Sequence, residues 1–262
     1  MNAGNMRDDI RRSRTTLGFA IGMIVGMVCA ILLLDMLDLD FSPPTGVNMP
    51  VYIVPAGYAF VIWGFIYVGL LAYGIFQARR DQRANPRLRA ASSWFNLSCV
   101  FNVLWFTGVI SQQLWLTIIC MFGMLFCLVA ISKALGIARI QVPTREIWMT
   151  RVPISLYFGW ITAATPINTT TFLQSIGFEG LGIAPDIWSL ILLVVAMTIA
   201  ILVFFSRYAN VIYLLVIVWA FIGIAVSNTS GGSPLVFWTA LIGAGAVLIT
   251  VFVARMNGYA RI

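Results

Sequence analysis

The residues best suited to chemistry in this sequence are neutral amides and large aromatic rings inside long apolar runs. Asn102, Trp63, Trp105 and Trp160 lie away from the ends of such runs, and Asn168 lies late in one. Hydrocarbon offers a polar group no water, so an amide or indole N–H there needs a partner from the protein or from a ligand. Rings can stack on a flat molecule and the N–H groups can donate to it, which is the chemistry of binding.

Groups for catalysis or metal binding are scarce. The 262 residues contain no histidine, which removes the commonest metal ligand and the usual general base near neutral pH. No charged residue lies near the middle of an apolar run, and all four cysteines lie inside runs, where they behave as small apolar residues. We therefore expect no catalytic residue, no metal site and no cofactor. The lack of midspan charge also argues against an ion-coupled transporter with a titratable relay.

The composition requires that membrane helices position these groups. The chain is 61% hydrophobic and 10% charged, with a mean hydropathy of +0.95. A soluble domain carries about 25% charged residues, so this chain could not cover itself with polar surface in water. The composition thus predicts an integral, multi-pass membrane protein. It excludes a soluble enzyme, a disulfide-stapled secreted domain and a disordered chain.

Eight apolar runs separate cleanly, and each is long enough to cross a bilayer as a helix. Continuous runs such as residues 191–205 lack the period-two alternation of a β-barrel strand. The sequence therefore predicts an all-α, polytopic membrane helical bundle with eight transmembrane helices. The predicted spans are residues 17–37, 54–77, 91–111, 114–136, 151–173, 187–206, 211–227 and 235–254.

The charges predict the orientation of these spans. If the amino terminus is cytoplasmic, all 16 Lys and Arg residues fall on the cytoplasmic side, as the positive-inside rule favours. We therefore expect both termini in the cytoplasm, and we expect the cell (plasma) membrane. The net charge of +7 then follows from topology, so the expected partner is the lipid bilayer and not a nucleic acid. The acidic residues on the other side are Asp35, Asp38, Asp40, Glu179 and Asp186.

Three predicted helices carry aromatic and amide groups at overlapping depths. Trp63 and Asn102 each lie nine residues from the outer end of their span, which is a depth of about 13 Å. Helical spacing places each set on one face of its helix. The sets are Phe60, Trp63 and Tyr67; Asn102 and Trp105; and Trp160, Ala164 and Asn168.

Two interpretations of these faces stay open. Amides and aromatic rings in membrane helices often only pack against neighbouring helices. An apolar cavity with a few polar anchors is instead the usual form of a small-ligand site. Gly18, Gly22 and Gly26 form a separate small-residue ridge, for packing within the bundle or for a homodimer.

Three motifs occur in order along the chain: Pro55-x-Gly57-Tyr58 followed by Trp63 and Tyr67, then Asn102-x-x-Trp105, then Val152-Pro153 with Trp160, Ala164 and Asn168. Through residues 17–173 this order resembles the tryptophan-rich sensory protein/translocator protein (TspO/MBR) family. Two positions depart from the family pattern. Tyr58 replaces the usual Trp, and Ala56 replaces the second Pro.

The resemblance implies a five-helix bundle with a pocket toward the outer side, closed by the loop over residues 38–54. Family members bind porphyrins and other flat lipophiles, so a porphyrin is the implied ligand. Aromatic walls would stack on its rings while Asn102 and Asn168 donate to its polar groups. The predicted ligand-binding residues are Pro55, Tyr58, Phe60, Trp63, Tyr67, Asn102, Trp105, Trp160, Ala164 and Asn168.

The resemblance also suggests a division of the chain. Residues 1–16 are predicted to be a basic cytoplasmic tail, residues 17–175 a five-helix TspO/MBR-like bundle, and residues 176–262 a three-helix C-terminal extension. Family members of ordinary length lack such an extension. Trp219 and Asn228 echo Trp160 and Asn168, and we interpret this echo as coincidence.

Our leading hypothesis is a non-enzymatic membrane receptor or carrier of a flat hydrophobic small molecule, porphyrin- or tetrapyrrole-like, with a sensory or transport role. One alternative is a transporter or permease of a lipophilic substrate without ion coupling, in which the last three spans move. Another is a membrane scaffold subunit with no ligand. An enzyme acting on its bound ligand is disfavoured because the predicted pocket lacks an acid–base group.

Overall fold

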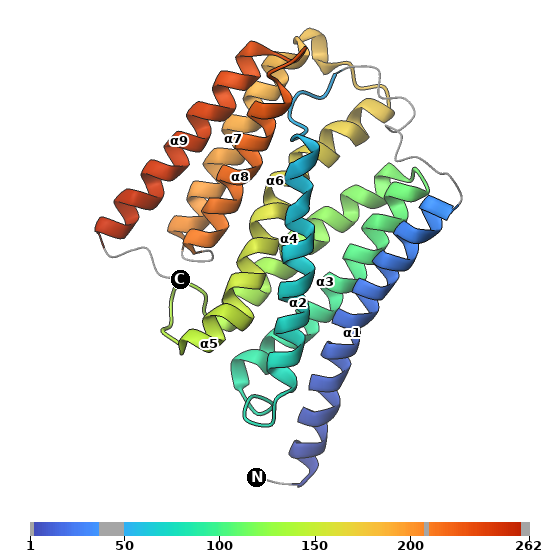
Figure 1. Cartoon of the computed structure of the whole chain (residues 1–262), viewed down its shortest axis with the longest axis vertical. Helices are drawn as coiled ribbons and strands as arrows, with labels where there is room; N and C mark the ends of the chain where they lie inside the picture. The colour runs from blue at the N-terminus through green and yellow to red at the C-terminus, as the bar shows by residue number, and fades with distance from the viewer. Residues whose placement is uncertain (1–2, 37–49, 207–209, 258–262) are drawn as a thin grey trace. The chain divides into compact units, whose positions relative to one another are not determined.

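Eight long helices make up most of the chain in the computed structural model, which describes residues 3–36, 50–206 and 210–257 (Figure 1). They confirm the predicted all-α architecture of eight helices. Between them lie a short α5 (Thr144–Glu146) with the π-helical turn η2 (Ile147–Arg151), and the 3₁₀ turns η1 (Gly57–Val61) and η3 (Gly180–Gly182). The long helices are α1 (Ala3–Met36), α2 (Ile62–Ala78), α3 (Pro86–Ile110), α4 (Leu114–Leu135), α6 (Val152–Ser175), α7 (Pro185–Phe205), α8 (Val211–Ser227) and α9 (Pro234–Met256).

Five of the described helices are long and apolar enough to cross a membrane. Helix α8 is a shorter apolar helix, and its bounds coincide with the predicted seventh span. The side of the membrane on which each terminus lies stays a prediction. The five helices are Gly57–Ala78, Pro86–Ile110, Leu114–Leu135, Pro185–Phe205 and Pro234–Met256.

The chain divides into two compact units, which are described separately. Unit 1 comprises Met1–Pro43 and Gly64–Ile154, and unit 2 comprises Pro44–Trp63 and Ser155–Ile262. Each unit therefore combines segments that are distant in the sequence. Part of the loop predicted to close the pocket, residues 38–49, lies outside the described residues, as do Asp38, Asp40, Arg207 and Arg261.

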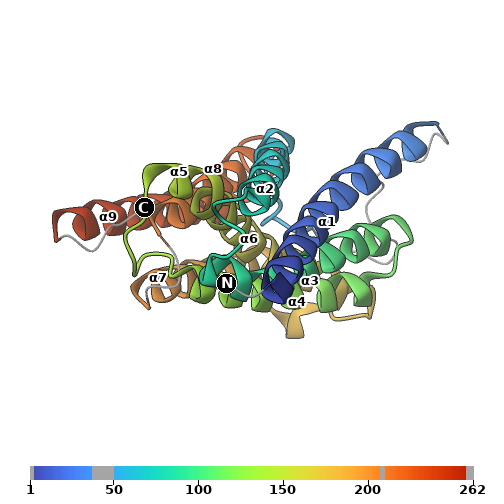
Figure 2. The same cartoon turned by 90° about the horizontal axis from the view of Figure 1, so that it is seen from below.

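Unit 1 is built on the helix pair α3 and α4, with α1 packed along α3 (Figure 2). Asn85 caps the start of α3 by accepting a hydrogen bond from the Arg87 amide, and Pro86 occupies the first turn, where no amide hydrogen is needed. Helix α4 ends at Gly136, whose φ of 62° is left-handed. That conformation favours glycine and closes the helix end.

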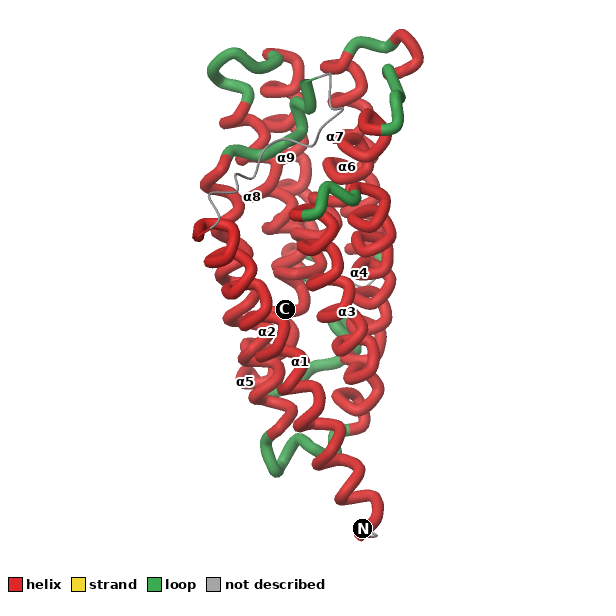
Figure 3. Tube along the Cα trace, turned by 90° about the vertical axis from the view of Figure 1, so that its right-hand side faces the viewer, coloured by secondary structure: helices red, strands yellow, loops and turns green. Residues whose placement is uncertain are grey.

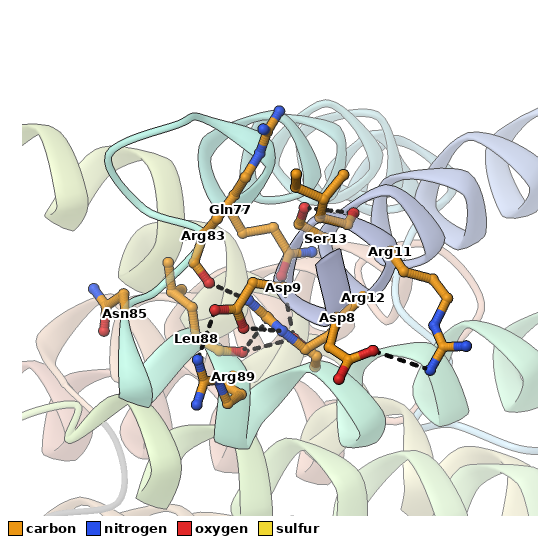
Figure 4. Close-up of polar contacts among 12 residues, drawn as sticks. Asp8, Asp9, Arg11, Arg12, Ser13, Gln77, Arg83, Asn85, Leu88 and Arg89 are labelled. Carbon is orange, nitrogen blue, oxygen red and sulfur yellow. Dashed lines mark hydrogen bonds and ion pairs between the residues drawn. The ribbon is translucent and has the colours of Figure 1, made fainter. Parts of the chain in front are cut away.

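Helix α1 begins at Ala3, so most of the predicted basic tail is helical and continuous with the first span. Its 34 residues extend about 51 Å, which exceeds a hydrocarbon core of about 30 Å. Asp9 is 4% exposed and pairs with Arg89 at 2.7 Å, while Arg12 donates to the carbonyls of Arg83 and Leu88 (Figure 4). Burial lowers the pKa of Arg12, and the Asp9 carboxylate partly offsets this shift. These contacts dock the N-terminal part of α1 on the start of α3 and on the turn before it.

Unit 2 is centred on α8, where 11 of 17 residues are buried. Helix α8 packs against α9, α7 and η1, and α7 also packs against α9. A Cβ atom at Gly159 of α6 would lie 2.7 Å from the Val216 Cβ and 2.8 Å from the Tyr213 carbonyl oxygen. Glycine therefore permits α6 to approach α8 this closely. Helices, turns and loops account for all the described residues of both units (Figure 3).

Candidate functional site

Four aromatic rings from two segments of unit 2 form a cluster. Phe60 lies in η1 and Trp63 in the first turn of α2, while Tyr157 and Trp160 lie in α6. The Trp160 ring meets Phe60 edge-to-face at a centroid distance of 5.5 Å and Trp63 at 6.4 Å. Trp63 is also 6.2 Å from Tyr157. The structure thus brings together Phe60, Trp63 and Trp160, three of the predicted ligand-binding residues. We call these four rings the aromatic cluster.

The indole N–H of Trp160 is the unusual polar group in this cluster. Trp160 is 2% exposed, and its Nε1 atom has no hydrogen-bond partner among the described residues. Buried polar groups nearly always have a partner, and leaving one unmade costs about 1–3 kcal/mol. An unpaired buried donor beside aromatic rings is suited to a ligand that carries an acceptor.

The chain before α2 approaches α8 very closely. A Cβ atom at Gly223 would lie 2.9 Å from the Pro55 Cβ and 3.0 Å from the Ala59 Cβ. The Ala56 amide donates to the Gly223 carbonyl at 2.9 Å. We call residues 52–59 the lead-in segment. Pro55, a predicted ligand-binding residue, is therefore buried beside α8.

Three side chains, from the middle of α8 to the residue just after its end, also hold the lead-in segment. Each side chain donates a hydrogen bond to a backbone carbonyl. Because every residue has such a carbonyl, the sequence does not reveal which one accepts. Together with the Ala56 amide they tie the segment to α8 along its length. The bonds are Trp219 Nε1 to Ala59 O at 3.0 Å, Ser227 Oγ to Val54 O at 2.7 Å, and Asn228 Nδ2 to Tyr52 O at 2.8 Å.

Sequence reasoning missed this role of α8. Trp219 and Asn228 were interpreted as a coincidental echo of Trp160 and Asn168, whereas both fasten the lead-in segment. Tyr58, another predicted ligand-binding residue, packs edge-to-face on Trp219 at 5.4 Å. The spacing of Trp219 and Asn228 was the available signal, but it does not identify backbone acceptors.

The remaining predicted residues of unit 2 lie later in α6. The Asn168 side chain donates from Nδ2 to the Ala164 carbonyl at 3.0 Å, one turn earlier in the same helix. Both residues are half-buried. Their place in a ligand site stays a prediction.

Three predicted residues lie in unit 1. The Tyr67 hydroxyl donates to Asn102 Oδ1 at 3.4 Å, so α2 and α3 bring these two side chains together. Asn102 is 0% exposed, and its Nδ2 atom lies 3.9 Å from the Met124 sulfur in α4. Trp105, one turn from Asn102, lies 6.5 Å from the Phe106 ring. Within unit 1 the predicted amide is therefore a buried and bonded group.

Comparison with known proteins gives one result. A family model described as TSPO-like protein matches residues 18–253. No curated protein and no solved structure gives a significant match. The family match extends well past residue 173, where the motif resemblance ended, and includes α7, α8 and most of α9. The chain is thus an integral, multi-pass membrane protein in contact with the lipid bilayer, and it belongs to the TSPO-like protein family.

Proposed function

We propose that this protein is a non-enzymatic membrane receptor or carrier that binds a flat hydrophobic molecule, porphyrin- or tetrapyrrole-like, at the aromatic cluster of unit 2. The observation that carries the proposal is the buried indole N–H of Trp160, which lacks a partner among the described residues. Family membership and the motif resemblance support the same ligand class.

The cluster suits such a ligand for two reasons. Phe60, Trp63 and Trp160 offer aromatic surface on which a flat ring system can pack. A carboxylate or carbonyl oxygen on the ligand would accept from Trp160 Nε1 and recover the free energy that the unpaired donor costs.

The chemistry of the chain supports binding without conversion. The sequence has no histidine, and Cys99, Cys120 and Cys127 are buried and reduced inside helices. The described residues contain no group of three His, Cys, Asp or Glu side chains that could hold a metal ion. Three of the four rings in the cluster are Phe or Trp, which have no acid–base role, and Tyr157 is the one phenol there.

A porphyrin titration of the full-length protein in detergent tests the proposal. We expect saturable binding, measured by the Soret absorption shift and by quenching of tryptophan fluorescence. Trp160→Phe keeps a ring but removes the N–H donor, so we expect affinity to fall about tenfold. Trp238→Phe is the matched control because Trp238 is 61% exposed on α9. Unsaturable binding, or equal affinity in both variants, would refute the proposal.

A receptor and a carrier differ in transport. Proteoliposomes loaded with porphyrin should release it faster than protein-free vesicles if the protein is a carrier, and Trp160→Phe should remove the difference. Binding without accelerated release would identify a receptor.

A further inference from the structure

Two hollows adjoin on the surface of unit 1, between α1 and α3. One has a volume of about 470 Å³ and is polar, with Asp8, Asp9, Arg11, Arg12, Arg89 and Asn96 in its walls. The other has a volume of about 440 Å³ and is apolar, with Gly18, Gly22, Val100, Val103 and Leu104 in its walls. Thr15 lines both hollows. They therefore form one continuous depression, which we call the α1–α3 groove.

The groove changes from polar to apolar in the same direction on both helices. On α1 the polar walls end at Thr15 and the apolar walls continue to Met23. On α3 the polar walls end at Asn96 and the apolar walls begin at Cys99. The predicted first span starts at residue 17, so the polar part lies at the expected membrane–water boundary and the apolar part in hydrocarbon. This order matches the head and tail of a phospholipid.

The polar part carries excess positive charge. Its walls hold three arginines and two aspartates. The Asp9 carboxylate is shared, since it lies 2.7 Å from Arg89 and 3.9 Å from Arg12 (Figure 4). Arg11 pairs with Asp8 at 3.6 Å, and both are largely exposed, so this pair is weak. A phosphate group would complement the charge that the two carboxylates leave unmatched.

One atom in the wall of the polar hollow, the side-chain oxygen of Asn96, is a hydrogen-bond acceptor without a donor among the described residues. This Oδ1 atom is buried. A carboxamide oxygen accepts hydrogen bonds and cannot pair with a phosphate oxygen. A headgroup that carries a hydroxyl in addition to its phosphate would satisfy both Asn96 and the arginines.

The apolar part has open space beside its glycines. A Cβ atom at Gly18 or Gly22 would meet no atom within 4 Å. Across the groove, Val100, Val103 and Leu104 are each more than a third exposed. An acyl chain lying along the two glycines would cover this apolar surface.

We infer that the α1–α3 groove binds one anionic phospholipid whose headgroup bears a hydroxyl, with phosphatidylglycerol as the representative. The phosphate faces Arg11, whose side chain is largely exposed, the headgroup hydroxyl donates to Asn96, and one acyl chain follows Gly18 and Gly22. This site is independent of the aromatic cluster, which belongs to unit 2.

Native mass spectrometry of the full-length protein in detergent tests the apolar part. With phosphatidylglycerol added, we expect one saturable lipid adduct on the wild type. Gly22→Leu fills the groove, and leucine is a better helix former than glycine, so the helix is retained. We expect this variant to lose the adduct. Gly26→Leu is the matched control, because Gly26 lies on the same ridge with open space around it but outside the groove walls.

The headgroup assignment is tested in the same assay. Arg11→Gln should weaken phosphatidylglycerol binding about fivefold, whereas Arg14→Gln, an exposed neighbour outside the groove walls, should leave it unchanged. Phosphatidylmethanol, a phosphodiester with the same charge but no headgroup hydroxyl, and phosphatidylcholine, which has neither net charge nor a donor, should both bind more weakly. Asn96→Leu should remove the preference for phosphatidylglycerol over phosphatidylmethanol.

Three results would overturn the inference. One is an adduct that Gly22→Leu leaves intact. A second is equal binding of phosphatidylcholine and phosphatidylglycerol. The third is a dimer in place of a lipid adduct, lost in Gly22→Leu and Gly26→Leu alike, since the whole ridge would then contact a second copy of the chain.

Discussion

Trp160 and Trp219 present nearly the same geometry to neighbouring rings of η1, yet their indole N–H groups differ. Trp160 meets Phe60 at 5.5 Å and 83°, and Trp219 meets Tyr58 at 5.4 Å and 89°. Trp219 donates to the Ala59 carbonyl, whereas Trp160 has no partner among the described residues. Ring packing is therefore the same on both sides of η1. The two sides differ in whether the indole N–H has a hydrogen-bond acceptor.

The difference teaches how to separate a structural tryptophan from a candidate binding one. The α8 side of η1 is closed, since its polar groups pair with the backbone of the lead-in segment. The α6 side keeps a donor for which the described residues offer no acceptor. Variants on the α8 side should thus change stability, and variants on the α6 side should change binding.

The largest effect should come from filling the contact between α8 and the lead-in segment. Gly223→Leu places a side chain where a Cβ atom alone is 2.9 Å from Pro55. Overpacking of this kind costs about 1–3 kcal/mol and occasionally more, so we expect the steepest fall in the free energy of unfolding. Thermal unfolding in detergent measures it. Gly245→Leu on α9 is the control, because its Cβ has open space, and equal melting temperatures would contradict the closed contact.

Removing the Asn228 side chain should have the next largest effect. Asn228 donates to the Tyr52 carbonyl and accepts from the Ser233 amide, and it is buried. Asn228→Ala leaves both partners unpaired, so we expect a loss of about 1–3 kcal/mol. Hydrogen exchange should accelerate at the Ala56 amide, which donates to the Gly223 carbonyl when the lead-in segment is held against α8. Thr229→Ala, an exposed neighbour, should change neither measurement.

Trp219→Phe tests the bonded indole with most of its ring volume kept. The substitution removes the donor to the Ala59 carbonyl at 3.0 Å. We expect a loss of about 1 kcal/mol in the free energy of unfolding, measured by denaturant titration in mixed micelles. An unchanged stability would mean that the hydrogen bond adds nothing to this side of η1.

Trp160→Phe should have the smallest effect on stability. Its N–H has no partner among the described residues, so the substitution breaks no hydrogen bond there. It also removes the free-energy cost of a buried donor without an acceptor. Both Trp→Phe substitutions lose the same ring volume, and only Trp219→Phe also loses a hydrogen bond, so we expect Trp160→Phe to cost less in the free energy of unfolding. A loss equal to that of Trp219→Phe would remove the distinction between the two sides.

The helices were predictable because continuous apolar runs define them, and the predicted seventh span coincides with α8. The length of α1 was not predictable, because the charged residues before Leu17 resemble a solvated tail. Their helix is docked by partners such as Arg89, which is 80 residues from Asp9. Helical spacing and depth predicted Tyr67 and Asn102 for one ligand site, but not the hydrogen bond that the two side chains make with each other. The role of Trp219 was not predictable either, because its acceptor is a backbone carbonyl and every residue has one.

The ties between α8 and the lead-in segment also set an order of events during biosynthesis. The bonded partners are separated by 160 to 176 residues. At about 5–20 residues per second, roughly 10–30 s pass between synthesis of the lead-in segment and synthesis of its anchors. Until α8 is inserted, these carbonyls lack their final donors. A nascent chain that is paused or truncated after α6 would therefore contain the aromatic cluster but not α8, which holds the lead-in segment in place. Quality-control proteases should recognise such a chain.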